Sequence, residues 1–225
     1  MKKFIILLER DKDRVDHVNK IRTRFPDIQV FGAIDGQTNK IEEILNTKEF
    51  LLSDDYKNKC NRGQLGCLFS HIFLWKKIVA ENIKECVIFE DDVEIPNDFH
   101  ERFLNIHKEL PQNYDFLYLF VHPKQYKVLT EKDAAFIKGN KYISKAYKTY
   151  GTVGYCISLE GAKKLLKLFS KVTGNVDTQI STNLNKLNIF SVLKPFLSTI
   201  GQLESNDKNS KLKSNVWRTK KLQIV

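Results

Sequence analysis

Three consecutive acidic residues, Glu90, Asp91 and Asp92, follow an apolar run from Cys86 to Phe89. The run has the composition of a buried strand, so we expect the three carboxylates at the end of that strand. Like charges this close raise one another's pKa values, and a divalent cation relieves the repulsion. Carboxylate oxygens suit Mg²⁺ or Mn²⁺, particularly when a nucleotide diphosphate supplies further oxygens. The cluster predicts a metal or substrate site; the alternative is an acidic turn that leads into the helix near Pro96.

Four other polar residues are candidates for binding a ligand beside these acids. Ser70 and His71 belong to a predicted helix over 62–81 that leads almost directly into the acidic strand. A neutral histidine donates to a phosphate or sugar hydroxyl, and a core histidine satisfied by a backbone carbonyl is the alternative. Arg10 and Arg14 follow the first predicted strand, at the edge where ligands gather in α/β sheets. A guanidinium there pairs with phosphate, unless both residues are surface arginines of a charged helix.

Two further positions lie in the C-terminal half of the chain. Gly151 begins the segment Gly151–Tyr155, whose two glycines permit a tight turn or close backbone approach to a ligand. This segment lacks the spacing of a dinucleotide-binding loop. Asp177 lies at a predicted loop-to-helix junction, where an aspartate is either a general base or a helix cap. The chain contains no Ser-His-Asp hydrolase elbow, P-loop or HExxH motif.

Alternating strands and helices are expected to position these residues. Strand-like runs over 3–8 and 28–31 flank a helix over 12–25, and this β-α-β opening favours a parallel sheet covered by helices. Asn61 and Gln64 form a capping box that starts the helix carrying His71. The remaining expected elements are strands over 86–89, 116–121, 155–158 and 189–192, helices over 98–109, 159–170 and 178–187, and an irregular region over 124–150.

Length and charge narrow the class of protein. The 225 residues fit a single domain, expected over 1–206, followed by a basic tail over 207–225 that holds half of the net charge of +10. A basic tail with interleaved apolar residues suits an anionic membrane surface; nucleic-acid binding and a solvated end are the alternatives. No apolar run is long enough for a transmembrane helix, and the stretch after Met1 is too short for a signal peptide. We therefore expect a cytoplasmic protein.

The cysteines fit the same compartment. The four cysteines show no CxxC pair and no zinc-site spacing, so we expect free thiols. Cys67, Cys86 and Cys156 lie in apolar patterns and are expected to be small core residues.

Four blocks of residues occur in the order and spacing of one known family. They are Ile6–Arg14 with Ala33–Gly36, Arg62–His71 with Trp75, Val87–Val93, and Gly151–Leu166 with Asp177. Through these blocks the chain resembles the bacterial lipopolysaccharide and lipooligosaccharide glycosyltransferases of glycosyltransferase family 25, relatives of the collagen galactosyltransferase domain. The family often has Asn at Leu7 and Glu at Gln64, although Gln retains the capping role.

The resemblance implies a nucleotide-sugar glycosyltransferase with a GT-A-like α/β fold. Such a fold has a mostly parallel central sheet flanked by helices and binds the nucleotide with its N-terminal half. The resemblance makes the acidic cluster a variant of the DxD signature, with Asp92 contacting Mn²⁺ or Mg²⁺ and with Glu90 and Asp91 on donor hydroxyls. The other residues expected to bind the donor are Arg10, Arg14, Ser70, His71 and Gly151.

The same resemblance implies an inverting reaction in which Asp177 is the catalytic base. The favoured donor is UDP-galactose, and the acceptor is a terminal sugar of a lipid-linked lipooligosaccharide or lipopolysaccharide. The basic tail would hold the enzyme peripherally at the inner face of the bacterial inner membrane. The alternatives are a glucosyl- or N-acetylhexosaminyltransferase of the same family, a regulatory phosphoacceptor domain that binds Mg²⁺, and a non-catalytic basic α/β domain that binds nucleic acid.

Overall fold

A mixed seven-stranded sheet forms the centre of the chain in the computed structural model, which describes residues 1–122, 125, 142–147, 149–194 and 196–200. The strand order is β2-β1-β4-β8-β6-β10-β7. Five strands run in one direction, and β7 and β8 run in the other. The strands are β1 (Lys2–Leu7), β2 (Ile28–Gly32), β4 (Glu85–Glu90), β6 (Phe116–Tyr118), β7 (Ile143–Lys145), β8 (Gly154–Ser158) and β10 (Ile189–Val192).

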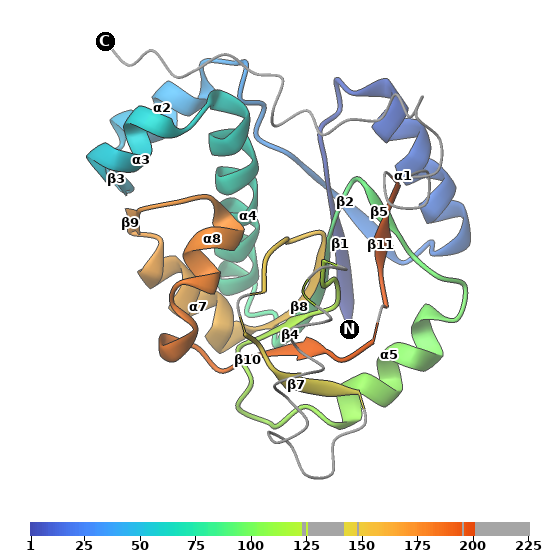
Figure 1. Cartoon of the computed structure of the whole chain (residues 1–225). Helices are drawn as coiled ribbons and strands as arrows, with labels where there is room; N and C mark the ends of the chain where they lie inside the picture. The colour runs from blue at the N-terminus through green and yellow to red at the C-terminus, as the bar shows by residue number, and fades with distance from the viewer. Residues whose placement is uncertain (123–124, 126–141, 148, 195, 201–225) are drawn as a thin grey trace.

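Helices flank the sheet on both faces, as Figure 1 shows. On one side α4 (Arg62–Ala80) packs against α7 (Leu159–Leu168), and on the other lie α1 (Lys12–Arg24) and α5 (Phe99–Lys108). Among the described helices, none is both long and apolar enough to cross a membrane. The expected α/β class, with a mostly parallel central sheet between helices, is confirmed. The smaller elements are α2 (Lys40–Asn46), α3 (Asp54–Lys59), α8 (Val176–Ser181), the 3-10 turn η2 (Leu184–Lys186), and the strand pairs β3 (Leu51–Leu52) with β9 (Lys171–Val172) and β5 (Val93–Glu94) with β11 (Ser198–Thr199).

The local sequence explains the main elements. Phe4–Leu7 and Cys86–Phe89 are buried throughout, because both faces of β1 and β4 are covered by helices. The predicted capping box at the start of α4 is present: the Asn61 side chain accepts from Gln64 N, and the Gln64 side chain accepts from Asn61 N, both at 2.8 Å. Along α4 the buried residues include Trp75, which packs against Phe169 with ring centroids 5.2 Å apart.

The structure corrects two expectations about the C-terminal half. The helix expected over 178–187 is α8, which begins at Val176, so Asp177 lies inside its first turn and Asn175 is the N-cap residue. Of the two alternatives for Asp177, the helix cap is therefore wrong. The strand expected over 116–121 pairs only as Phe116–Tyr118. Most of the region expected to be irregular lies outside the described residues, but part of it forms the short strand β7.

The next two strands of the sheet are added on opposite sides of β1. After β1, the crossover through α1 adds β2 on one side, and the later crossover through α4 adds β4 on the opposite side of β1. Open α/β sheets bind ligands outside the carboxyl ends of the strands at such a switch point. Because β1 and β4 are parallel, their carboxyl ends lie together, and Ile6 is in register with Glu90.

Candidate active site

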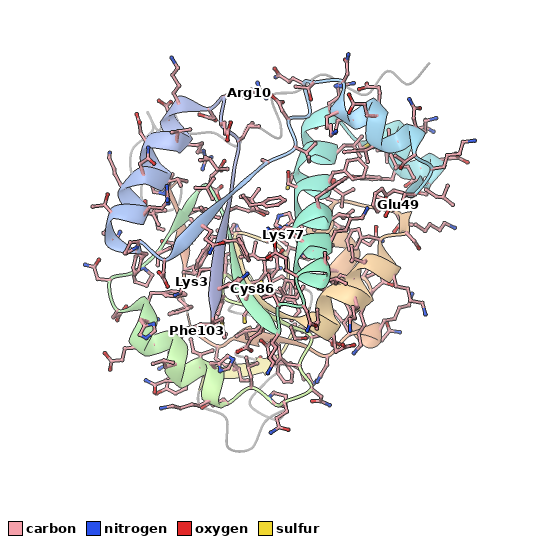
Figure 2. All side chains as sticks on the ribbon, turned by 180° about the vertical axis from the view of Figure 1, so that it is seen from behind. Lys3, Arg10, Glu49, Lys77, Cys86 and Phe103 are labelled. Atoms are coloured by element: carbon pink, nitrogen blue, oxygen red, sulfur yellow. The ribbon has the colours of Figure 1, made fainter. Side chains whose placement is uncertain are left out.

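A pocket opens where β1 and β4 end. Figure 2 shows Arg10 at this end of the molecule, whereas Lys3 and Cys86, near the starts of the two strands, lie toward the other end. Seven of the nine predicted site residues line the pocket, and only Gly151 and Asp177 do not. The complete lining is Ile6, Leu8, Arg10, Arg14, Ala33, Ile34, Gly36, Gly63, Cys67, Ser70, His71, Glu90, Asp91 and Asp92.

Arg14 is the buried cation of the pocket. It lies in the first turn of α1 and is only 5% exposed, so it is not a surface arginine of a charged helix. Its Nη1 atom is 3.6 Å from Asp91 Oδ1 and 3.7 Å from Asp92 Oδ2. These distances allow electrostatic attraction but exceed the length of a hydrogen bond, and Nη1 has no hydrogen-bond partner within the described residues. One buried positive charge thus faces the acids.

The charges of the Asp91 and Asp92 carboxylates are only partly compensated by their surroundings. Their side chains are 23% and 25% exposed. Burial raises the pKa of Asp91 to about 6, and burial together with the charge of Glu90 raises the pKa of Asp92 to about 7, despite the attraction of Arg14. Within the described residues, Asp92 Oδ1 is buried and has no hydrogen-bond partner. A hard divalent cation fits these residues, because it supplies the positive charge and takes carboxylate oxygen ligands.

Glu90 differs from the two aspartates beside it. Its Oε1 atom accepts a hydrogen bond of 2.6 Å from Thr152 Oγ1 and lies 3.2 Å from His71 Nε2. Burial acts to raise the pKa of Glu90, but the hydrogen bond and charge of His71, with Thr152 and Arg14, outweigh burial and lower the pKa. Asp91 Oδ2 accepts only a long hydrogen bond of 3.4 Å from Leu8 N. The three acids therefore divide into one well-satisfied carboxylate and two less satisfied ones.

Ser70 and His71 are adjacent on α4 but make different contacts. The Ser70 hydroxyl donates to Gly66 O at 2.6 Å and accepts from Ile34 N at 2.8 Å, so it fixes α4 against the loop after β2. His71 is buried, and its Nδ1 atom lies 2.8 Å from the Tyr155 hydroxyl. His71 is therefore satisfied by side chains on both ring nitrogens rather than by a backbone carbonyl.

Arg10 lies at the edge of the pocket. Its side chain is 41% exposed, and its Nε atom is 2.7 Å from Asp35 Oδ2. The pairing joins the end of β1 to the loop that follows β2. Arg10 thus retains an exposed guanidinium edge at the pocket mouth, in contrast to the buried Arg14.

Gly151 and Asp177 form a separate pair. Gly151 N donates to Asp177 Oδ2 at 3.3 Å, and Thr178 N donates to Asp177 Oδ1 at 2.7 Å. Gly151 has φ +92°, a conformation that favours glycine, and an added Cβ would lie 3.1 Å from the Phe120 ring. Asp177 is still close enough to the pocket that its charge contributes, after burial and Glu90, to the raised pKa of Cys67.

Sequence reasoning missed three residues of this region. Cys67, expected in the core, is half-buried and lines the pocket one turn before His71 on α4. Its sulfur lies within 4.8 Å of ligand atoms of His71 and Glu90. His71 and Glu90 are already hydrogen-bonded to each other within this group. Helical spacing indicates Cys67, but no sequence signal points to Thr152 or Tyr155 as partners of Glu90 and His71.

Comparison with known proteins identifies the family. Residues 1–180 match the model described as glycosyltransferase family 25 (LPS biosynthesis protein). A glycosyltransferase 25 family member of Aedes aegypti is 29% identical over 189 residues, covering 74% of this chain and 30% of the relative. Human procollagen galactosyltransferase 2 is 28% identical over 171 residues, covering 72% and 27%. A bovine relative named probable inactive glycosyltransferase 25 family member 3 is 28% identical over 174 residues, covering 72% and 28%.

The chain spans less than a third of the length of these curated relatives. Mouse xyloside xylosyltransferase 1 in its apo form aligns over 81% of this chain and 67% of its own, at 12% identity and a TM-score of 0.35. The family model, by contrast, covers most of the chain and all of the described pocket residues. The chain belongs to glycosyltransferase family 25.

Proposed function

We propose that the chain is an inverting glycosyltransferase that requires Mn²⁺ or Mg²⁺ and transfers galactose from UDP-galactose to a terminal sugar of lipooligosaccharide or lipopolysaccharide. The observation that carries this proposal is the unsatisfied Asp92 Oδ1 atom in a pocket at the sheet's switch point. The name of the human relative supports galactose, and the family description supports the acceptor.

The pocket residues divide the work of binding the donor. Asp92, with Asp91, would hold the cation, which would stabilise the charge that develops on the nucleotide diphosphate leaving group. Arg14 supplies a fixed positive charge on the same side, 3.6 Å from Asp91. Arg10 is positioned at the pocket mouth to pair with phosphate.

Asp177 is the proposed base. In an inverting transfer, the acceptor oxygen forms a bond to the anomeric carbon, the bond from that carbon to the diphosphate breaks, and the acceptor proton passes to a carboxylate. Hydrogen bonds from Gly151 N and Thr178 N orient the Asp177 carboxylate, and the carboxylate lies outside the cluster that engages the donor. The base requires a carboxylate that lies near the pocket and is not used to bind the donor.

The end of the described chain supports a role for the membrane surface. β11 pairs with β5, and Ile200 N donates to Asp92 O at 3.1 Å, so residue 200 lies beside the acidic cluster. The basic segment 207–225, outside the described residues, follows a few residues later in the sequence. Attraction of this segment to anionic lipid would bring the pocket close to a lipid-linked acceptor.

The central test measures transfer from a panel of UDP-sugars to a lipooligosaccharide acceptor, with and without Mn²⁺. We expect transfer from UDP-galactose that requires the cation, lost in Asp92→Asn. Asp177→Asn should bind the donor normally yet lose transfer, which separates the base from the donor site. Full activity of Asp92→Asn without added metal would contradict the metal assignment. Preference for UDP-glucose or a UDP-N-acetylhexosamine would select the alternative donor class, and donor binding without transfer would indicate a non-catalytic domain.

A second test concerns the tail. Removal of residues 207–225 should abolish binding to vesicles that contain anionic lipid, while transfer to a soluble, deacylated acceptor is retained. Equal vesicle binding by the full and truncated chains would contradict the membrane role. Binding of the full chain to arbitrary DNA, but not to the vesicles, would select the nucleic-acid alternative.

A further inference from the structure

Three buried side chains and one pocket carboxylate form a continuous hydrogen-bonded chain. Trp75 Nε1 donates to the Tyr155 hydroxyl at 2.9 Å, that hydroxyl lies 2.8 Å from His71 Nδ1, and His71 Nε2 lies 3.2 Å from Glu90 Oε1. Trp75, Tyr155 and His71 are at most 1% exposed. We call this set the Trp75–Glu90 relay. It joins α4 and the end of β4 to β8, which lies far later in the sequence.

The donors of the relay all point toward Glu90. An indole N–H can only donate, and an ionised carboxylate can only accept. The Tyr155 oxygen accepts from Trp75, which leaves its proton for His71 Nδ1. His71 therefore carries its own proton on Nε2 and donates to Glu90. The other neutral tautomer of His71 would place a lone pair against the carboxylate, so the two ends of the relay determine its direction.

The surroundings of Tyr155 hold its side chain in place and so maintain this direction of donation. Its ring stacks on Phe116 with centroids 4.4 Å apart and an interplanar angle of 14°. Its hydroxyl is enclosed by α4, and burial raises the pKa of Tyr155 well above its usual value, so the donated proton is retained. A buried polar chain is costly unless every member is satisfied. Here the last acceptor is a residue that lines the pocket.

The relay leaves one oxygen of Glu90 for a ligand. His71 and Thr152 both contact Oε1, and the structure gives Oε2 no hydrogen-bond partner within the described residues. Both donors use Oε1, so Oε2 keeps its lone pairs for a further hydrogen bond. A neutral hydroxyl is a better match than a second cation, since the charge of Glu90 is already partly offset by the relay.

We propose that Tyr155 and Trp75 are positioning residues which, through His71, fix Glu90 so that its Oε2 atom accepts a hydrogen bond from one hydroxyl of the nucleotide-sugar donor. This inference rests on the function proposed above and adds two residues that lie behind the pocket wall. No proton transfer is required. Tyr155 and Trp75 touch no substrate, and their effect passes entirely through the orientation of His71 and Glu90.

The test is a cycle of donor-binding measurements by calorimetry, in the presence of Mn²⁺. The proteins are the full-length wild type and Tyr155→Phe, and the ligands are UDP, UDP-galactose and UDP-galactose analogues that each lack one hydroxyl. We expect Tyr155→Phe to weaken UDP-galactose binding about 10-fold, the effect of one lost hydrogen bond to a fixed charged group. For one analogue the variant and the wild type should bind equally, because the contacted hydroxyl is absent.

Tyr114→Phe is the matched control. Tyr114 is also a buried tyrosine whose hydroxyl is hydrogen-bonded, but its partner is Glu85, at the opposite end of β4. It should lose stability without a change in donor binding. A milder second variant, Trp75→Phe, removes the first donor of the relay and should show the same ligand pattern with a smaller effect, which keeps the test decisive should Tyr155→Phe fold poorly.

Two results would overturn the inference. One is wild-type affinity of Tyr155→Phe for UDP-galactose and every analogue. The other is an equal loss for all ligands including UDP, which would indicate general damage rather than a lost hydroxyl contact. Failure of the wild type to bind any UDP-sugar would instead overturn the proposed function, together with the inference that depends on it.

Discussion

The acidic residues at the two ends of β4 differ in their hydrogen-bond partners and in the direction of their pKa shifts. At its start, Glu85 Oε2 accepts from the Tyr114 hydroxyl at 2.8 Å and lies 2.9 Å from His107 Nε2. The hydrogen bond from His107 lowers the pKa of Glu85 more than burial raises it. Just beyond the other end, burial raises the pKa values of Asp91 and Asp92, to about 6 and about 7.

This difference separates acids that stabilise the fold from acids that await a ligand. Glu85 stabilises the folded chain in its ionised form, since its partners are already in place. Ionised Asp91 and Asp92 destabilise it, because Arg14 offers only distant attraction and Asp92 Oδ1 has no partner in the described residues. A carboxylate that lines a pocket and lacks hydrogen-bond and charge partners is therefore a functional candidate.

The largest expected effect concerns activity. Asp92→Asn should lower kcat/KM for transfer by about 10²–10³-fold, the loss typical of removing one electrostatic contact made in the transition state. Glu85→Gln should leave kcat/KM unchanged, because Glu85 lies at the far end of the strand. Steady-state kinetics across a range of Mn²⁺ concentrations measures both. Similar losses in the two variants would mean that the two ends do not differ in function.

Stability should show the reverse pattern. Glu85→Gln replaces a charged acceptor of two hydrogen bonds and should cost about 1–3 kcal/mol of unfolding free energy. Asp92→Asn in metal-free protein should leave stability unchanged or raised, because it removes a poorly compensated charge. Urea unfolding at pH 8 gives both values, with Tyr114→Phe as a check on the Glu85 cluster. A larger loss for Asp92→Asn than for Glu85→Gln would reverse the assignment of roles.

Much of this arrangement could be predicted from sequence, where the signal is local. The apolar strand before the acids, the capping box of α4 and the β-α-β opening all depend on neighbouring residues, and each is present. The same local reasoning could not separate Arg14, which is buried, from Arg10, which is exposed, because both follow β1.

Contacts between distant residues were beyond local reasoning. His71 and Tyr155 meet only because β8 pairs with β4, and the sequence does not encode strand order in any short pattern. The Gly151–Asp177 contact is of the same kind. The position of Asp177 within α8 was missed because the Asn175 cap precedes it by two residues.

The pH dependence of stability provides a sharper test of the difference between Asp92 and Glu85. Below its folded pKa of about 7, Asp92 binds a proton in the folded protein that the unfolded chain has already released near pH 4. Metal-free protein should therefore lose stability as pH rises from 6 to 8, by about 1.4 kcal/mol from this group. Thermal unfolding across this range, with and without Mn²⁺, measures the slope.

Two variants control this slope. Asp92→Asn should reduce it to the smaller part that comes from Asp91, whose folded pKa is about 6. Glu85→Gln should retain it, because Glu85 has a lowered pKa and stays ionised throughout the range. Saturating Mn²⁺ should also flatten the slope, since a cation that replaces the proton removes the difference between the folded and unfolded states. A metal-free wild type with no slope between pH 6 and pH 8 would contradict the raised pKa of Asp92.

The smallest expected effect tests whether a buried atom without a hydrogen-bond partner affects activity when it lies outside the pocket. Ser191 Oγ on β10 is also buried without a partner in the described part of the chain, but Ser191 does not line the pocket. Ser191→Ala should keep full transfer activity. Its free energy of unfolding should rise by about 0.5–1 kcal/mol, because a buried hydroxyl without a partner destabilises the folded state. Kinetics and urea unfolding of this variant check both parts. A loss of transfer would show that an unsatisfied atom can serve function away from the pocket. Asp92 would then be a candidate because it lies at the end of β4, and not because Oδ1 lacks a partner.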